Sequence, residues 1–118
     1  MIDLVRERFE LARKSNPRLV VDYPAIWRAL DDYADVVDVE RHAIDCAEWL
    51  GAQRKRRFAA PTLRRWLRDK PTHNRLTDYI DWMYRRFPDV ERSVLEGIIN
   101  REGPLLAHEV AERLERVR

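Results

Sequence analysis

The chain has 118 residues, of which 45% are hydrophobic and 37% are charged, and its formal net charge is +2. This length fits one domain with a hydrophobic core and leaves little room for a second. The single cysteine, Cys46, excludes an internal disulfide, and no apolar run approaches the roughly eighteen residues that cross a membrane. The charged, amphipathic start of the chain is unlike a signal peptide, so we expect a cytoplasmic protein without a membrane partner.

The spacing of the apolar residues predicts helices along almost the whole chain, and no segment shows the sustained alternation of a strand. A first helix is expected over 2–14, where Ser15-Asn16-Pro17 ends it. A second helix is expected to begin near Pro24, because proline suits the first turn of a helix. The run Leu19-Val20-Val21 is compatible with extended structure, but one such run makes no sheet.

Further helices are expected in the rest of the chain. Asp38 is a suitable N-cap for a helix over 39–50, which is expected to end at Gly51. Four more helices follow, separated by Pro71, Pro88 and Gly103-Pro104, at about 59–69, 74–87, 89–101 and 104–116. The sequence therefore predicts an all-α fold: a compact orthogonal bundle of six to seven short helices that forms a single domain over residues 1–118.

Positive charge gathers between residues 51 and 75. This segment holds nine basic residues and one acid, so its net charge is +8, while the rest of the chain carries −6. The nine basic residues are Arg54, Lys55, Arg56, Arg57, Arg64, Arg65, Arg68, Lys70 and Arg75. Residues 31–48, by contrast, hold seven acids and one base. This dipolar pattern predicts one surface for an anionic partner.

The helix expected at 59–69 gives the basic segment a face. Its apolar residues would pack on the core, which would direct Arg64, Arg65 and Arg68 outward together. The mobile linker Arg54–Arg57 would reach the same anion. An arginine-rich helix and linker of this kind is typical of a surface that contacts phosphates. The alternative is a solvated arginine face whose charge is offset by the acids of the two preceding helices.

This part of the sequence also resembles a known family. The residues concerned are Glu40, Ala47-Glu48-Trp49-Leu50, Lys55-Arg56-Arg57 and Leu63-Arg64-Arg65-Trp66-Leu67-Arg68. The pattern resembles the helical C-terminal segment of phage and prophage replication-initiation proteins, the replisome-organiser and DnaD/DnaT-like group. The resemblance covers about a quarter of the chain. It implies binding of single- or double-stranded DNA during replication, through Arg56, Arg57, Arg64, Arg65 and Arg68.

Two segments resemble parts of helix-turn-helix and winged-helix DNA-binding domains. Thr62-Leu63-Arg64-Arg65-Trp66 is similar to the recognition helices of MerR- and excisionase-like regulators. Residues 92–114 resemble the first two helices of a winged-helix domain, and the sequence ends at Arg118, where a recognition helix and wing would begin. Either this segment is only two packed helices, which we favour, or the chain is part of a longer protein.

The four tryptophans divide into two pairs by their position on the expected helices. Trp27 and Trp66 fall on apolar stripes and are expected in the core. Trp49 and Trp82 lie off the main stripe of their helices. Each of these two is either a base-stacking platform or partner contact, or is buried against a neighbouring helix, and burial is the favoured interpretation.

A metal site is a weaker hypothesis. His42, Asp45 and Cys46 are spaced to share one face of a helix, but zinc sites need three or four ligands. The other histidines, His73 and His108, are far away in the sequence. Cys46 falls on an apolar stripe, where a lone cysteine is usually a small core residue. We therefore expect no metal.

The sequence contains no glycine-rich phosphate loop, no nucleophile motif and no carboxylate pair with an obvious electrophile. We therefore expect no enzymatic activity and no cofactor. The leading hypothesis is an accessory domain for replication or regulation, of phage or mobile-element origin, that binds nucleic acid, with DNA favoured over RNA. A larger protein complex is a further partner left open, as is the oligomeric state. The alternative is a protein-interaction module, an adaptor or inhibitor, whose basic face docks an acidic partner surface.

Overall fold

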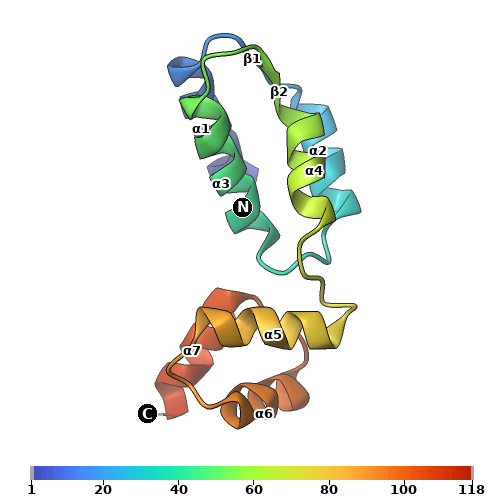
Figure 1. Ribbon diagram of the computed structural model, residues 1–118, viewed down its shortest axis with the longest axis vertical. Coiled ribbons are helices and arrows are strands. Elements are labelled where there is room, and N and C mark those ends of the chain that lie inside the picture. Colours follow the sequence, from blue (N-terminus) through green and yellow to red (C-terminus); the bar gives the residue numbers. More distant parts are fainter. Residues whose placement is uncertain (1, 118) are drawn as a thin grey trace. The chain divides into compact units, whose positions relative to one another are not determined.

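The computed structural model describes residues 2–117, which form seven helices and two short strands (Figure 1). In chain order these are α1 (Ile2–Ser15), β1 (Leu19–Val20), α2 (Tyr23–Asp32), α3 (Val39–Ala52), β2 (Arg57–Phe58), α4 (Ala59–Arg68), α5 (Leu76–Arg86), α6 (Arg92–Glu102) and α7 (Ala107–Val117). The all-α class and the seven short helices predicted from the sequence are confirmed. None of the helices within residues 2–117 is long and apolar enough to span a membrane.

The contacts within the chain group it into two compact units, which we describe separately. The first unit consists of Met1–Ala34 and Val39–Lys70, and the second of Asp35–Asp38 and Pro71–Arg118. Helices α1 to α4 belong to the first unit, and α5 to α7 belong to the second. The single domain expected from the sequence stays a prediction.

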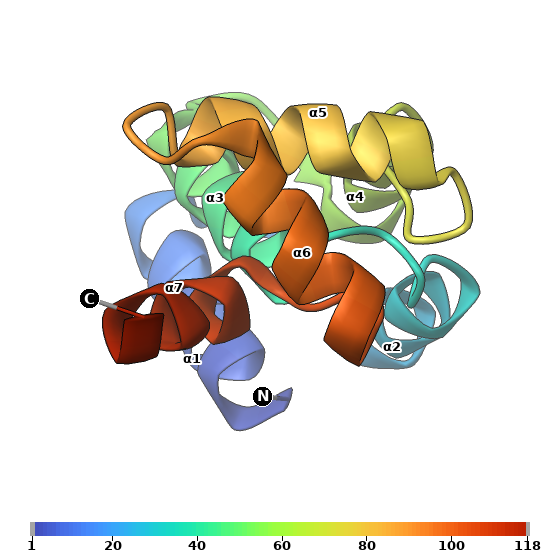
Figure 2. The same cartoon turned by 90° about the horizontal axis from the view of Figure 1, so that it is seen from below.

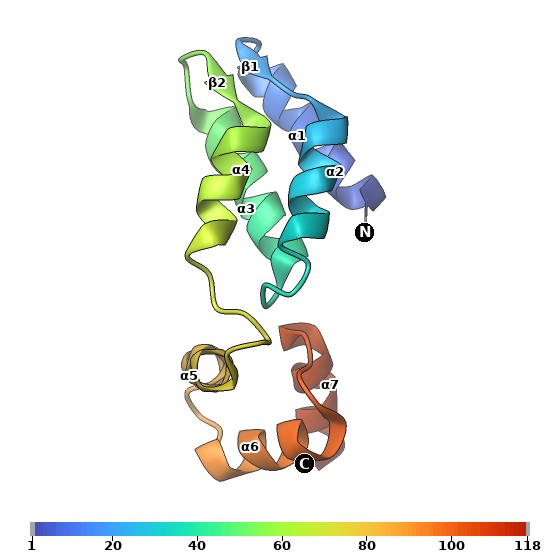
Figure 3. The same cartoon turned by 90° about the vertical axis from the view of Figure 1, so that its right-hand side faces the viewer.

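The first unit passes twice through the same order of helix, strand and helix. Helices α1 and α3 run side by side in one direction, and α2 and α4 return in the opposite direction (Figures 1 and 3). Strands β1 and β2 pair in parallel, with Leu19 opposite Arg57 and Val20 opposite Phe58. The expectation that Leu19-Val20-Val21 has no strand partner is therefore wrong. The linker expected to be mobile ends in a paired strand, which satisfies backbone groups of Arg57 and Phe58.

The core of the first unit is built from the apolar stripes of its four helices. Small residues on α1 and α3 let the backbones of these two helices come close together. The fully or almost fully buried residues include Val5, Phe9, Ala12, Ile26, Ala29, Ala43, Cys46, Ala47, Leu50, Leu63 and Leu67.

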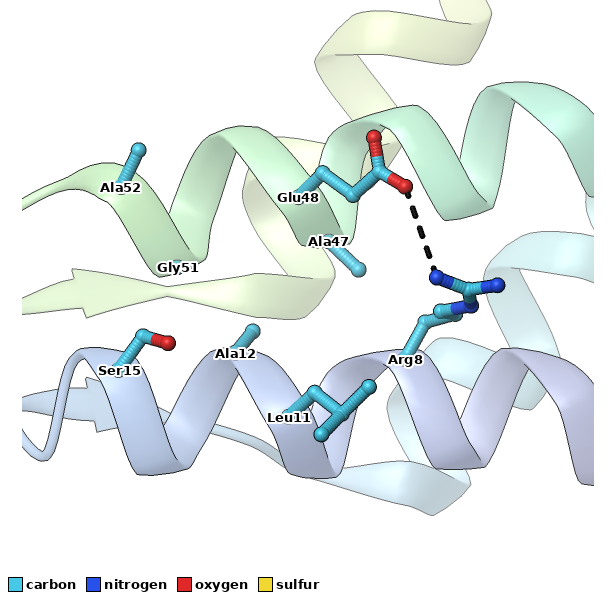
Figure 4. Close-up of a pocket in the computed structure, with 8 residues that line it drawn as sticks. All are labelled: Arg8, Leu11, Ala12, Ser15, Ala47, Glu48, Gly51 and Ala52. Atoms are coloured by element: carbon cyan, nitrogen blue, oxygen red, sulfur yellow. Dashed lines mark ion pairs between the residues drawn. The ribbon is translucent and has the colours of Figure 1, made fainter.

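The backbones of α1 and α3 lie close together at Gly51. The prediction that it ends the helix is wrong, because α3 continues through Gly51 to Ala52. A Cβ placed on Gly51 would lie 3.0 Å from the Cα of Ala12, and Figure 4 shows Gly51 on the side of α3 that faces Ala12. The close approach of a neighbouring backbone therefore favours glycine at this position, and no left-handed turn is involved.

We expect Gly51→Val to lower the free energy of unfolding by about 1–2 kcal/mol, because added atoms must push α1 and α3 apart. Gly97→Ala, in the middle of α6, is the control. A Cβ at Gly97 meets no atom within 4 Å, so this change should raise the stability by about 0.5–1 kcal/mol through helix propensity alone. Urea unfolding of both variants measures the effects. Equal stability of Gly51→Val and the unaltered protein would show that the close approach imposes no constraint.

The second unit surrounds its own core with three helices that run in three different directions (Figures 2 and 3). The segment Asp35–Asp38 joins this core although its neighbours in sequence belong to the first unit. Val36 forms an antiparallel bridge with Thr72, and the N–H of Val37 donates to the carbonyl of Pro71 at 2.9 Å. The main buried residues are Val37, Tyr79, Met83, Leu95, Ile98, Ile99, Ala107, Val110 and Leu114.

Asp38 enters α3 differently from the N-cap expected from the sequence. Its φ is 57°, in the left-handed region that aspartate tolerates better than most residues. An N-cap residue normally has extended backbone. The carboxylate of Asp38 instead lies 3.7 Å from a guanidinium nitrogen of Arg86 in α5. Its side chain therefore forms an ion pair within the second unit.

Candidate nucleic-acid interface

Two tryptophans lie together where α3 and α4 meet. Trp49 and Trp66 each directly precede a fully buried leucine, Leu50 and Leu67. Neighbouring residues on a helix point about 100° apart, so both indoles are turned from the core toward the edge of the helix pair. Their ring centroids are 6.0 Å apart and the ring planes are tilted by 51°. The expectation that Trp27 and Trp66 lie in the core is wrong, since both side chains are only partly buried.

The two indoles form the rim of a small surface groove of about 210 Å³, which we call the tryptophan groove. Its lining residues are Trp49, Arg57, Thr62, Arg65 and Trp66. The hydroxyl of Thr62 donates to the carbonyl of Phe58 at 2.7 Å, which ties the end of β2 to the first turn of α4. Each lining residue is thus held by a helix or by the paired strand.

Positive groups approach both tryptophan rings. The guanidinium carbon of Arg57 lies 5.4 Å from the centroid of the Trp49 ring, and the ammonium of Lys70 lies 5.8 Å from that of Trp66. Both distances are within the range of a cation–π interaction. Arg57 reaches the groove because side chains of successive strand residues point to opposite faces, which sends Phe58 the other way.

The cations beside the two tryptophans lack carboxylate partners within the described residues. Among residues 2–117, no ion pair is formed by Arg57, Arg65 or Lys70. The buried Nε of Arg57 also finds no hydrogen-bond acceptor in this part of the chain. A buried donor without an acceptor is uncommon in folded proteins. The groove therefore carries positive charge that the described residues leave unneutralised.

The structure separates the three arginines of α4 that were expected to point outward together. Arg64 lies toward α2, where a guanidinium nitrogen is 2.8 Å from the carboxylate of Asp32, and it lines another hollow of about 370 Å³ beside Phe58. Arg65 instead lines the tryptophan groove. Because α4 packs on both α2 and α3, consecutive residues of α4 face different neighbours. The expectation of one shared face for Arg64 and Arg65 is therefore corrected.

The remaining basic residues of the segment lie in several environments. Arg54, Lys55 and Arg56 are exposed on the connection between α3 and β2. Arg68 lies 3.6 Å from the neighbouring carboxylate of Asp69. Arg75 belongs to the second unit, where it pairs with Asp78 at 3.4 Å. The basic segment is therefore divided between the two units, with eight of its nine cations in the first.

Two of the acids that precede the basic segment pair with arginines outside it. Asp45 pairs with Arg41 at 3.1 Å along α3, and Glu48 lies 3.8 Å from Arg8 of α1. The latter pair spans a hollow of about 330 Å³ between α1 and α3 (Figure 4). Of these acids, Asp32 is the one that reaches the basic segment in the first unit, through Arg64. Local acids thus offset part of the positive charge of the basic segment, but they do not neutralise the charge of the tryptophan groove.

His42, Asp45 and Cys46, the residues considered as metal ligands, do not form a metal site within the described residues. Within residues 2–117 no group of three His, Cys, Asp or Glu residues is placed to hold a metal ion. Cys46 is fully buried, and this burial raises the pKa of its thiol to about 12. The thiol is therefore protonated at neutral pH, as is typical of a core cysteine.

The segment that resembles part of a winged-helix domain forms α6 and α7 of the second unit. The two helices are joined at Gly103, whose φ is 83°, and they share the core of that unit with α5. The exposed positions of α7 include Glu112, Glu115 and Arg116. This mixture of charges does not make a basic surface.

Comparison of the chain with known protein families, with curated proteins and with solved structures finds no match. The resemblance to replication-initiation proteins therefore stays a prediction.

Sequence reasoning finds the basic residues but not the way they combine with the tryptophans. Trp49 lies off its apolar stripe, and the favoured expectation that it is buried against a neighbouring helix is wrong, because the residue is 39% exposed. Trp66 is expected in the core because its spacing from Leu63 fits a helical stripe. A signal for both tryptophans is present in the sequence. Each is followed directly by a leucine, in Trp49-Leu50 and Trp66-Leu67, and the leucine takes the core position.

Proposed function

We propose that this protein acts by binding nucleic acid and not by catalysis, and that the tryptophan groove is the centre of the binding surface. The observation that carries the proposal is the set of three cations, Arg57, Arg65 and Lys70, that approach two tryptophans without carboxylate partners of their own. Nucleic acids offer both groups that such a surface attracts, phosphates for the cations and flat bases for the indoles.

The resemblance to replication-initiation proteins favours DNA over RNA and a role in the replication of a phage or mobile element. The exposed cations Arg54, Lys55 and Arg56 add positive charge to the same unit, which strengthens attraction to a polyanion. Arg64 is better regarded as a structural residue, because Asp32 holds it. A cytoplasmic location suits this function and remains a prediction.

The proposal is tested by fluorescence anisotropy with labelled random-sequence DNA, single-stranded and duplex, between about 50 and 200 mM salt. The unaltered protein should bind with an affinity that falls steeply as salt rises. The triple variant Arg57→Ala, Arg65→Ala and Lys70→Ala should bind at least about tenfold more weakly. Its salt slope should be flatter by about one unit for each phosphate that the variant no longer neutralises.

A matched control removes the same charge elsewhere. Arg85, Arg101 and Arg116 are exposed residues of the second unit, and their triple replacement by alanine should weaken binding much less than the groove variant. Equal losses in the two variants would contradict a role for the groove. Absence of salt-dependent binding in the unaltered protein would reject nucleic acid and leave the protein-interaction module, whose basic face docks an acidic partner.

A further inference from the structure

The pairs Tyr23–Trp27 and Trp49–Trp66 of the first unit differ in how much ring surface they leave open. Tyr23 and Trp27 are stacked, with centroids 5.4 Å apart and planes 24° apart, so each covers a face of the other. Trp49 and Trp66 are tilted by 51° and do not lie flat on each other. Trp49 is also 39% exposed. The second pair therefore leaves part of the Trp49 ring available to a flat partner, beside the Arg57 guanidinium that approaches the same ring.

The two pairs also differ in the charges around them. The hydroxyl of Tyr23 donates to the carboxylate of Glu10 at 2.7 Å, and the Arg6 guanidinium lies 4.8 Å from the Tyr23 ring. The Tyr23–Trp27 pair is thus accompanied by both a positive group, Arg6, and a negative group, Glu10. At the tryptophan groove, Arg57 and Arg65 supply positive charge, and no carboxylate of residues 2–117 forms an ion pair with either. The groove is complementary to a ligand that is flat and anionic.

We propose that the tryptophan groove binds single-stranded nucleic acid by stacking an unpaired base on Trp49, while Arg57 and Arg65 contact the adjacent phosphates. This inference rests on the nucleic-acid binding proposed above. An unpaired nucleotide offers a free ring face beside a phosphate, whereas the bases of a duplex keep their faces stacked on one another. Base–aromatic stacking is also tolerant of sequence, because every base has such a face.

The size of the groove and the geometry of α4 support a single strand over other anions. The groove volume of about 210 Å³ is below the range of about 300–1,000 Å³ usual for pockets that enclose a small molecule. It suits one base of a strand that crosses the surface. A duplex would instead need free cations along α4 to follow its backbone, but Asp32 holds Arg64 and Asp69 lies beside Arg68.

The first experiment uses the unaltered protein and three labelled probes. These are an oligothymidylate of about 16 nucleotides, a duplex of the same length, and a strand of the same length in which no sugar carries a base. We expect the oligothymidylate to bind about tenfold or more tightly than the duplex and the abasic strand at one salt concentration. It should also quench the tryptophan fluorescence, whereas the abasic strand should not.

The second experiment compares variants of the two aromatic pairs. Trp49→Leu should weaken oligothymidylate binding about tenfold, Trp49→Phe should retain most of the affinity, and Trp27→Leu should change it less than about twofold. Circular dichroism checks that each variant keeps its helices.

Equal affinity for the oligothymidylate and the abasic strand would overturn base stacking, and so would a Trp49→Leu variant that binds as tightly as the unaltered protein. Either result with salt-dependent binding intact would leave the proposed nucleic-acid function standing. Failure of all three probes to bind would remove both the stacking inference and the proposed function.

Discussion

Asn16→Asp is expected to lower the free energy of unfolding by about 3 kcal/mol at neutral pH, although the two side chains have almost the same shape. Asn16 is 2% exposed. Its amide nitrogen donates to the carbonyls of Leu50 and Lys55, both at 3.2 Å, and its oxygen accepts from the N–H of Arg18 at 3.3 Å. A carboxylate cannot donate, so the substitution removes both donated hydrogen bonds and places negative charge against the two carbonyl oxygens.

The loss caused by Asn16→Asp should depend on pH. The folded state disfavours the charged form of the new carboxyl, which raises its pKa above the value in the unfolded chain. A raised pKa means that the folded state binds the proton more tightly, so the stability deficit is largest at neutral pH and shrinks as the pH falls through the folded pKa. The protonated carboxyl can donate one of the two lost hydrogen bonds.

Urea unfolding followed by tryptophan fluorescence at neutral and acidic pH measures this effect. Three of the four tryptophans belong to the first unit, so the signal reports mainly on the part that contains Asn16. Asn100→Asp is the control, because Asn100 is exposed on α6 and its replacement should change the stability by less than about 0.5 kcal/mol. A similarly small change for Asn16→Asp would mean that Asn16 does not hold the connection to β2.

Tyr79→Phe is expected to lower the free energy of unfolding by about 2–3 kcal/mol. Tyr79 is fully buried in α5. Its hydroxyl donates to the carbonyl of Leu105 at 2.7 Å and accepts from the N–H of the same residue at 2.9 Å. Loss of one oxygen atom therefore leaves both backbone groups of Leu105 without their partner in the turn between α6 and α7.

The pH dependence of this difference follows from the titration of the phenol. Burial raises the pKa of Tyr79 above its ordinary value. The stability that the hydroxyl contributes is therefore fully present below the ordinary tyrosine pKa of about 10, and it is lost as the pH rises from there through the raised pKa of the folded state. The gap between the unaltered protein and Tyr79→Phe should narrow in alkaline solution.

Thermal or urea unfolding of Tyr79→Phe should be compared with that of Tyr84→Phe. Tyr84 lies on the same helix and is 38% exposed, so its change should stay within about 0.5 kcal/mol. Trp82 provides a fluorescence signal within the second unit. If the two variants lose the same stability, the two hydrogen bonds between Tyr79 and Leu105 stabilise the protein no more than the exposed hydroxyl of Tyr84 does.

The helices of this protein are predictable because each carries its own apolar stripe and its own boundaries. Pro24 lies in the first turn of α2, as expected from its lack of an N–H. Gly51 shows where local signals fail, since a glycine at a helix end and a glycine under a neighbouring helix have the same appearance in sequence. The partner that decides between them, Ala12, is far away along the chain.

The candidate site is predictable in composition and not in arrangement. Clustering of basic residues is a local property, whereas the ion pair between Arg64 and Asp32 depends on how α2 packs against α4. The pairing of Arg57 with Leu19 in a parallel strand likewise depends on residues from opposite halves of the unit. A two-residue strand has no periodicity of its own, so the sequence around Arg57 indicates only a mobile linker.

The way the chain is shared between the two units bears on how the protein can be dissected. It passes from one unit to the other three times, because Asp35–Asp38 belongs with Pro71–Arg118. A fragment that ends at Lys70 would keep Val36 and Val37, both fully buried in the protein, but would lack Pro71 and Thr72, which bond to them. A single cut therefore cannot yield two complete halves, and deletion experiments must remove or replace the short insert as well.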